Sequence, residues 1–408
     1  MEIQPGKPKS LRKNNRKMVL SIFRKSGPLS VTELSERSGL SKTTIMKIVD
    51  YLLESGTVIS SGKGKSSTEG GKKPSLFHFN RTHGYVLSVQ ILATELFSVI
   101  TDLKADILEE ISIPLKRNQD IGSIVDSIAA SFRSLMKGAG IDSGEVIAMV
   151  IGSHGITDFE RGTVVSSPHF SSWGSHVPLG EMVGRRMSLE CPLYVDNWLR
   201  FQAYAELWKG KARDSRNFMV VDGGLEGLAA GIISGGAIQR GNHFLSGEIG
   251  HTIVNPFETE PCVCGGKGCF ENEIEVARLV KRAEVLRETH PDSGIFSEGR
   301  PVRPEDIFDA ANAGDELAES LMEEIIRWYA VGLLNTVLVA DPELIIIQGI
   351  YTKAGEFFRG RLERAVNDLS LVSIRKKIAI EYSALGKDRG VVGGAAYAVD
   401  RYFETLKV

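Results

Sequence analysis

Residues 247–273 read GEIGHTIVNPFETEPCVCGGKGCFENE and contain three of the four cysteines in a chain of 408 residues. Cys262, Cys264 and Cys269 follow His251 at short intervals, and the glycines between them permit tight turns. Thiolate and imidazole ligands suit a tetrahedral zinc ion, whereas so few cysteines in so long a chain argue against a disulfide framework. We therefore predict a closed, structural Zn²⁺ site at these four residues, with no open position for hydrolysis. Three reduced cysteines without a metal are the alternative.

Strand and helix patterns alternate on both sides of this stretch. Upstream, the strand candidates read VLSVQ, LFSVITDL, VIAMVIG and LYVDN, and a second set begins with FMVVDG and LAAGIISGG. Downstream, LIIIQG and KIAIEY lie between predicted helices. Each set opens with a strand, a turn and a second strand. The sequence thus predicts a duplicated α/β body of two lobes with a cleft between them.

The N-terminal part differs from the body in charge. Residues 1–80 contain 15 Lys and Arg against 6 Asp and Glu, although the whole chain has a net charge of −2. A basic segment joined to an acidic body is typical of a phosphate-binding module. The basic start is not followed by an apolar signal-peptide core, and no apolar stretch is long enough to span a membrane. We expect a soluble, cytoplasmic protein without a membrane partner.

The basic segment has the pattern of a helix-turn-helix. A first helix is expected between Arg12 and Ser26, followed by LSVTELSERSGLSKTTIMKIVDYLLESG. Ser30 or Thr32 can cap a short second helix, Gly39 allows a sharp turn, and Ser41 caps a third helix. The apolar positions expected on the inner face of the third helix are Ile45, Ile48, Val49 and Leu52.

The outer face of the third helix and a following loop are the candidates for contact with double-stranded DNA. In a helix-turn-helix the start of this helix docks into the major groove. Two short β-prone runs with a Gly/Ser/Lys-rich tip between them predict a wing whose lysines can follow phosphates. The predicted DNA-binding residues are Ser41, Lys42, Thr43, Thr44, Lys47, Lys63, Lys65, Lys72 and Lys73. A winged domain used for protein contacts is the alternative.

A winged helix followed by a two-lobed body with GEIGH and CVCGGKGCFENE resembles the ROK family (repressors, open reading frames, kinases) over nearly the whole chain. It is most similar to the family's transcriptional regulators, which include the xylose and N-acetylglucosamine repressors. The resemblance implies a winged helix-turn-helix at residues 1–80 and an actin-like ATPase (ribonuclease H-like) body. The body would have a small lobe at 81–195, completed by a helix at 388–408, and a large lobe at 196–387 with the zinc loop. It also implies a homodimer or a higher homo-oligomer.

Three departures from the kinase members of the family predict that ATP chemistry is lost. Residues 90–94, QILAT, stand where the kinases have Asp-x-Gly-Gly-Thr, and residues 225–227, LEG, replace Gly-Thr-Gly. Trp198 stands where the kinases have the Asp that acts as general base, and an indole cannot accept that proton. Asp196 is one residue too far along the strand and should face the other way. We therefore predict no catalytic residue and no enzyme activity.

The resemblance also implies a sugar pocket in the cleft. Glu248, His251 and Glu271 match the family's sugar-hydroxyl ligands, and Asn197 matches an amide of the same site. Gly155 and His169 fall in loops that close over the sugar, although the kinases usually have Asn at the position of His169. Trp198 is either a stacking platform for the sugar ring or a core-filling aromatic.

These observations predict a sugar-responsive transcriptional regulator, a repressor of carbohydrate-utilisation genes, which binds an operator and a small sugar effector. Two alternatives remain open. One is an ATP-dependent hexose kinase with a DNA-binding head. The other is a regulator controlled by a protein partner, with a vestigial sugar pocket.

Overall fold

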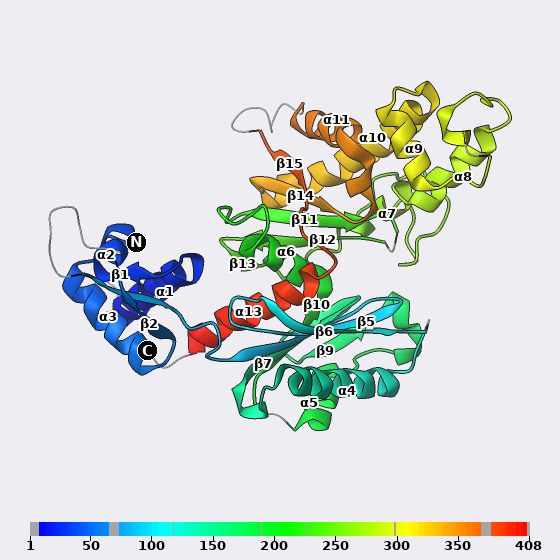
Figure 1. Ribbon diagram of the computed structural model, residues 1–408. Coiled ribbons are helices and arrows are strands. Elements are labelled where there is room, and N and C mark those ends of the chain that lie inside the picture. Colours follow the sequence, from blue (N-terminus) through cyan, green and yellow to red (C-terminus); the bar gives the residue numbers. More distant parts are fainter. Residues whose placement is uncertain are drawn as a thin grey trace.

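A computed structural model of the chain describes residues 8–64, 73–116, 118–188, 190–225, 227–297, 299–368 and 377–405. Figure 1 shows a small N-terminal head beside a larger body in which two sheets lie one above the other. A long helix, α13 (Arg389–Thr405), runs from between the two sheets toward the head.

The head is a winged helix-turn-helix, as the sequence predicted. Its sheet has the order β1-β3-β2. Ser30 caps the second helix through a reciprocal pair of hydrogen bonds with Glu33, Gly39 adopts a φ of 70°, and Ser41 caps the third helix. Of the two cap candidates for the second helix, Ser30 is therefore the one used. The elements are α1 (Pro8–Lys25), β1 (Leu29–Ser30), α2 (Val31–Ser38), α3 (Lys42–Glu54), β2 (Val58–Lys63) and β3 (Ser75–Phe79).

The inner face of α3 is also as predicted. Its buried residues are Ile45, Ile48, Val49 and Leu52. They belong to one apolar cluster with Phe23 of α1 and Leu34 of α2. This packing leaves the opposite face of α3 free of core contacts.

The first sheet of the body has the order β10-β7-β4-β5-β6. Helices α4 and α5 cover its outer face (Figure 1) and share an apolar cluster with its strands. The bounds are β4 (Tyr85–Ile91), β5 (Glu95–Thr101), β6 (Ile107–Pro114), α4 (Ile121–Ala139), β7 (Val146–Ser153), β8 (Ile156–Asp158), β9 (Thr163–Ser166), α5 (Leu179–Met187) and β10 (Leu193–Asn197).

The second sheet repeats this design in the order β13-β12-β11-β14-β15. In both sheets the central strand pairs antiparallel with the next strand along the chain and parallel with a later one. The predicted duplication is thus present in the strand order. The strands are β11 (Phe218–Gly223), β12 (Leu228–Ser234), β13 (Ala237–Ile238), β14 (Leu344–Gln348) and β15 (Ala379–Tyr382).

The remaining helices complete the second half of the body. Phe270, Tyr329 and Phe358 from three of them form an aromatic core with T-shaped ring contacts. The α-helices are α7 (Phe270–Glu273), α8 (Val276–Leu286), α9 (Pro304–Asn312), α10 (Glu316–Ala340) and α11 (Gly355–Asn367). The short 3-10 helices are η1 (Ser143–Glu145), η2 (Pro168–Trp173), η3 (Ile249–His251), η4 (Gly294–Phe296) and η5 (Ile350–Ala354).

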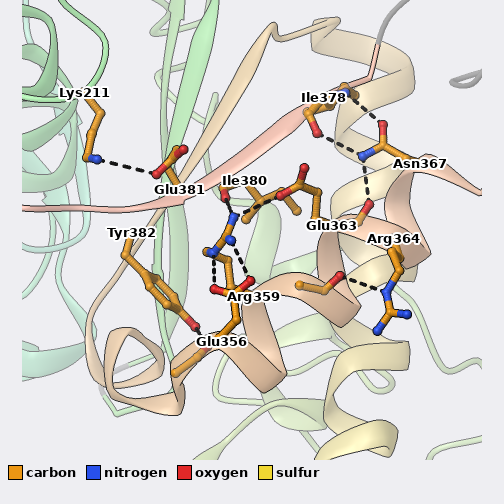
Figure 2. Close-up of polar contacts among 12 residues, drawn as sticks. Lys211, Glu356, Arg359, Glu363, Arg364, Asn367, Ile378, Ile380, Glu381 and Tyr382 are labelled. Carbon is orange, nitrogen blue, oxygen red and sulfur yellow. Dashed lines mark hydrogen bonds and ion pairs between the residues drawn. The ribbon is translucent and has the colours of Figure 1, made fainter.

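Helix α11 holds the edge strand β15 by polar contacts (Figure 2). Arg359 binds Glu356 and Glu363 and donates to the carbonyl of Ile380 at 3.0 Å. Asn367 donates to the carbonyl of Ile378 at 2.9 Å and accepts from its N–H at 2.8 Å. The side chains of one helix therefore fix the outermost strand of the sheet.

Helix α13 and helix α6 (Trp198–Trp208) lie together between the two sheets. A Cβ atom at Gly393 would lie 1.7 Å from the carbonyl oxygen of Phe201, so only glycine permits this close approach. Strands from both halves of the body pack against these two helices. Among the described residues, no helix has the length and apolar character needed to cross a membrane.

Candidate functional site

The predicted zinc ligands come together in one loop. His251 ends η3, Cys269 precedes α7, and the four ligand atoms all lie within 4.8 Å of one another. The Sγ atoms of Cys264 and Cys269 are 3.6 Å apart, and the Sγ of Cys262 is 3.7 Å from Nδ1 of His251. Zn–S bonds of about 2.3 Å place two tetrahedral ligands about 3.8 Å apart. The donor set and its spacing therefore fit a tetrahedral Zn²⁺ ion.

The glycines of the loop explain why this stretch folds as it does. Gly265 and Gly268 have positive φ angles of 84° and 72°. A Cβ at Gly268 would lie 2.0 Å from the carbonyl oxygen of Asn255, so only glycine fits at this position beside the backbone of Asn255. The N–H of Cys262 donates to the carbonyl of Gly266 at 2.8 Å, which closes the turn.

The thiols of the loop differ in their electrostatic surroundings. Burial raises the pKa of Cys262 and of Cys269. The N–H of Gly266, which donates to the sulfur, lowers the pKa of Cys264. Metal binding requires the thiolate form. A bound divalent cation would stabilise the thiolates of Cys262 and Cys269 and so offset the cost of their burial.

Two of the predicted sugar ligands lie directly beside this loop. Oε1 of Glu271 is 3.5 Å from Nδ1 of His251 and accepts a hydrogen bond from the Cys262 thiol at 2.8 Å. Oε2 of Glu271 would lie 3.2 Å from a Cβ at Gly227, in the second altered turn. The third, Glu248, is electrostatically coupled to both: burial raises its pKa, and the charge of His251 opposes this rise. The structure thus brings Glu248, His251 and Glu271 to one region.

Asn197, the amide of the predicted site, lies at the start of α6. Its Oδ1 accepts from the N–H of Leu199 at 2.9 Å and caps α6, while its Nδ2 donates to the carbonyl of Gly155 at 2.9 Å. Gly155 has a φ of 84°, and a Cβ there would lie 2.1 Å from the carbonyl oxygen of Ser166. The amide of Asn197 therefore fixes the glycine turn that was expected to close over a sugar.

An aromatic cluster adjoins this turn, and it includes a residue that the sequence analysis missed. His154 lies between His169 and Trp198, with ring centroids 4.6 Å and 5.1 Å away. Burial, with a smaller contribution from His169, lowers the pKa of His154 to about 3, so its ring is neutral at neutral pH. The only sequence signal was its place next to Gly155. Trp198 is half-buried, so it packs against the core and keeps part of its surface accessible.

Asp196 faces away from this cluster, as strand alternation predicted. Its two carboxylate oxygens accept from Arg200 at 2.8 Å and from Arg240 at 2.7 Å. Arg200 also donates to the carbonyl of Phe244 at 2.6 Å, in the loop that leads to Glu248. Asp196 is a fully buried anchor with two cationic partners, and the sequence analysis did not foresee this structural role.

The predicted DNA-binding residues cluster on the head where the structure describes them. Ser41, Lys42, Thr43 and Lys47 are exposed and Thr44 is half-buried at the start of α3, and Lys63 and Lys73 are exposed on the wing. Ser41 bonds to Thr43 and Thr44 at 3.0 and 2.9 Å, so its hydroxyl organises the helix start. Met46, 54% exposed, shares this surface and was not predicted. Lys65 and Lys72, and Glu226 of the second altered turn, lie outside the described residues.

The chain is similar both to transcriptional regulators and to sugar kinases. It is 28% identical to the xylose repressor of Caldicellulosiruptor bescii over 94% of each chain. A crystal structure of a ROK family transcriptional regulator, a homologue of the Escherichia coli MLC protein, superposes with a TM-score of 0.79 at 23% identity and covers 97% of each chain. A ROK family glucokinase from Streptomyces griseus, in complex with glucose and AMPPNP, has a TM-score of 0.64 at 27% identity; the match covers 78% of this chain and all of the enzyme.

The family comparison divides the chain at the same place as the fold. Residues 12–59 match the winged helix-turn-helix DNA-binding family, and residues 86–401 match the ROK family. The matched regions correspond to the head and to the two-sheet body. The chain therefore belongs to the ROK family and has a winged helix-turn-helix DNA-binding domain at its N-terminus.

Proposed function

We propose that this protein is a sugar-responsive transcriptional regulator, a repressor that binds operator DNA through α3 and the wing. The observation that carries the proposal is the presence, in one chain, of an exposed basic helix start on the head and of Glu248, His251 and Glu271 gathered in the body. Carboxylates and an imidazole suit vicinal sugar hydroxyls, because a ligand without them would leave buried polar groups unpaired. Similarity to a xylose repressor over the whole chain supports this reading.

The pocket would be formed by the zinc loop on one side and by Gly155, Asn197 and the aromatic cluster on the other. Trp198, half-buried and in contact with His154, would offer a flat apolar surface to the sugar ring. The metal, as a structural Zn²⁺, would hold His251 in place beside Glu271. The ion would serve geometry and not hydrolysis, since four protein ligands complete its coordination.

A hexose kinase with a DNA-binding head is the second candidate, because the body is similar to a glucokinase. The geometry favours the regulator. Trp198 opens α6 where a general base is needed, and Asp196, the nearest carboxylate in sequence, is paired with two arginines. Proton transfer requires a free carboxylate within hydrogen-bonding reach of the hydroxyl. We therefore propose that ATP chemistry has been lost.

We further propose that the functional units are residues 1–80, 81–195 with 388–408, and 196–387, and that the protein works as a homodimer or larger homo-oligomer in the cytoplasm, where its operator lies. A dimer would place two α3 helices on a palindromic site with half-sites about one helical turn apart, or a multiple of it. Sugar would shift DNA affinity only if it binds the two arrangements of the lobes unequally.

The test is calorimetry of the full chain with a panel of pentoses, hexoses, N-acetylated hexosamines and their phosphates, followed by operator binding at fixed salt. Glu271→Gln should weaken binding of the sugar that the wild type accepts, whereas Glu160→Gln, at an exposed turn, should not. The proposal fails if no sugar binds, or if a bound sugar leaves operator affinity unchanged. Phosphorylation of a hexose by ATP would favour the kinase instead.

A further inference from the structure

Helix α13 begins with an arginine that lies between the two sheets of the body. Nε of Arg389 donates to Oε1 of Gln202 at 3.0 Å and to Oε1 of Gln348 at 3.1 Å. Its Nη2 is 3.4 Å from Oδ2 of Asp222. Asp222 and Gln348 lie at the ends of β11 and β14, so the guanidinium contacts two neighbouring strands of the second sheet.

The backbone that carries Arg389 is packed on the first sheet. A Cβ at Gly390 would lie 2.1 Å from Oε1 of Gln90, the second-last residue of β4 in that sheet. A Cβ at Gly394 would lie 2.8 Å from the side chain of Val150 on β7. Because α13 is held this closely to the first sheet, the contact of Arg389 with Asp222 joins the two halves of the body.

The acceptors around the guanidinium are fixed in orientation. Nε2 of Gln348 donates to Oε1 of Glu206 at 3.3 Å, which turns the amide oxygen of Gln348 toward Arg389. Glu206 is fully buried and also accepts from the hydroxyl of Ser383. The side chains of Arg389 and Asp222 are 20% and 16% exposed, so solvent screens their attraction less than that of a surface pair.

The two strands that bear Gln90 and Asp222 reach the two altered turns of the sequence, residues 90–94 and 225–227. We propose that Arg389 is an internal latch, which closes the base of the cleft by binding Asp222 and Gln348. The guanidinium binds acceptors on β11, β14 and α6, while the helix that carries it is packed on the first sheet. The two halves are thus held together by a side chain of the protein itself, without a bound nucleotide.

The latch also connects to the head, because α13 reaches it. Asp400, near the other end of α13, accepts from Arg24 of α1 at 2.6 Å, and Phe403 packs on Phe79 with centroids 5.8 Å apart. The guanidinium of Arg24 lies 4.2 Å from the ring of Trp208 on α6. A helix of 17 residues is about 25 Å long, so opening of the latch would move a rigid rod that touches the DNA-binding domain.

The experiment is hydrogen–deuterium exchange of the full-length protein without effector, which makes it independent of the sugar proposal. Arg389→Met keeps the length of the side chain and removes its charge, and Asp222→Asn removes the charge of the partner. We expect at least a tenfold faster exchange in peptides from the start of α13 and from the ends of β11 and β14, with no change in α4 or α10. The double variant should exchange no faster than Arg389→Met, because that change alone already removes the Arg389–Asp222 contact.

Lys387→Met is the matched control, since it removes a positive charge two residues away that lies over Phe97 of the first sheet. It should exchange like the wild type. The proposal is overturned if Arg389→Met and Asp222→Asn leave exchange unchanged, if the double variant is additive, or if exchange rises uniformly over the body. Should Arg389→Met fail to fold, Asp222→Asn against Lys387→Met decides alone.

Discussion

Replacement of Lys42 and Lys47 by alanine tests directly whether the start of α3 faces DNA. Both side chains are exposed and form no ion pair within the part of the chain that the structure describes. In a dimer the double substitution removes four positive charges from the two α3 helices. Each phosphate contact contributes about 0.9 to the slope of log affinity against log salt, so the slope should become shallower by up to about 3.6. Thermal stability should not change, because neither lysine belongs to the core.

The assay is fluorescence anisotropy on a duplex that the wild-type protein has selected from a random pool, with salt varied from about 50 to 200 mM. Over this fourfold range the affinity ratio of wild type to variant should fall on the order of 10²-fold, because the electrostatic term is lost in the variant. Lys137→Ala, at an exposed position on α4, is the control and should behave like the wild type. A double variant that keeps the wild-type slope would refute the groove assignment, whatever its affinity at one salt concentration.

Four further outcomes can be measured. Protein purified without chelator should contain one zinc per chain by plasma mass spectrometry, and Cys264→Ser should lower this content; a metal-free wild type would exclude the zinc site. Trp198→Asp should show no ATP-dependent hexose phosphorylation in a coupled assay, because residues 90–94 and 225–227 still lack the glycine turns that cradle phosphates, and measurable turnover would contradict this. Ile48→Ala should reduce the free energy of unfolding of the head by about 2–5 kcal/mol in urea titration, because Ile48 is 5% exposed in the core of α3; a loss within error of zero would show that the face is misassigned. Burial lowers the pKa of His154 to about 3 from 6.5, so the unfolded chain gains the proton at a higher pH than the folded protein. The free energy of unfolding should therefore fall as the pH drops from 6.5 to about 3. His154→Phe should flatten this dependence, and an unchanged pH profile would contradict the prediction.

The sequence predicted those features whose cause is local. Ser30, Gly39 and Ser41 signal helix ends because a cap acts within one turn of its own helix. The cysteine loop was visible for the same reason: its four ligands and the glycines that bend it lie within one short stretch. The duplicated strand order followed from strand patterns that recur along the chain, and β11 and β14 appear where the buried runs were read.

Contacts across long separations could not be predicted in this way. His154 meets Trp198 only because β7 and β10 are neighbours in the sheet. Arg389 follows the loop SALGKD and has no pattern of its own, yet its partners come from α6, β11 and β14. The short helices α7 and α9 were also missed, because a few residues carry too little periodicity to separate a helix from a loop.

The same division between local and distant contacts explains how one function can be lost while another remains. The sugar ligands that we propose lie in or beside the zinc loop, a local unit shaped by its glycines. The phosphate site of a kinase instead requires two turns and a base to converge from different strands. The loss of ATP chemistry that we propose therefore needs only the exchange of single residues such as Trp198 at the ends of those strands, and the loop is not disturbed. The latch that we propose for Arg389, through its contacts with Asp222 and Gln348, would then hold the two halves of the body together without a nucleotide.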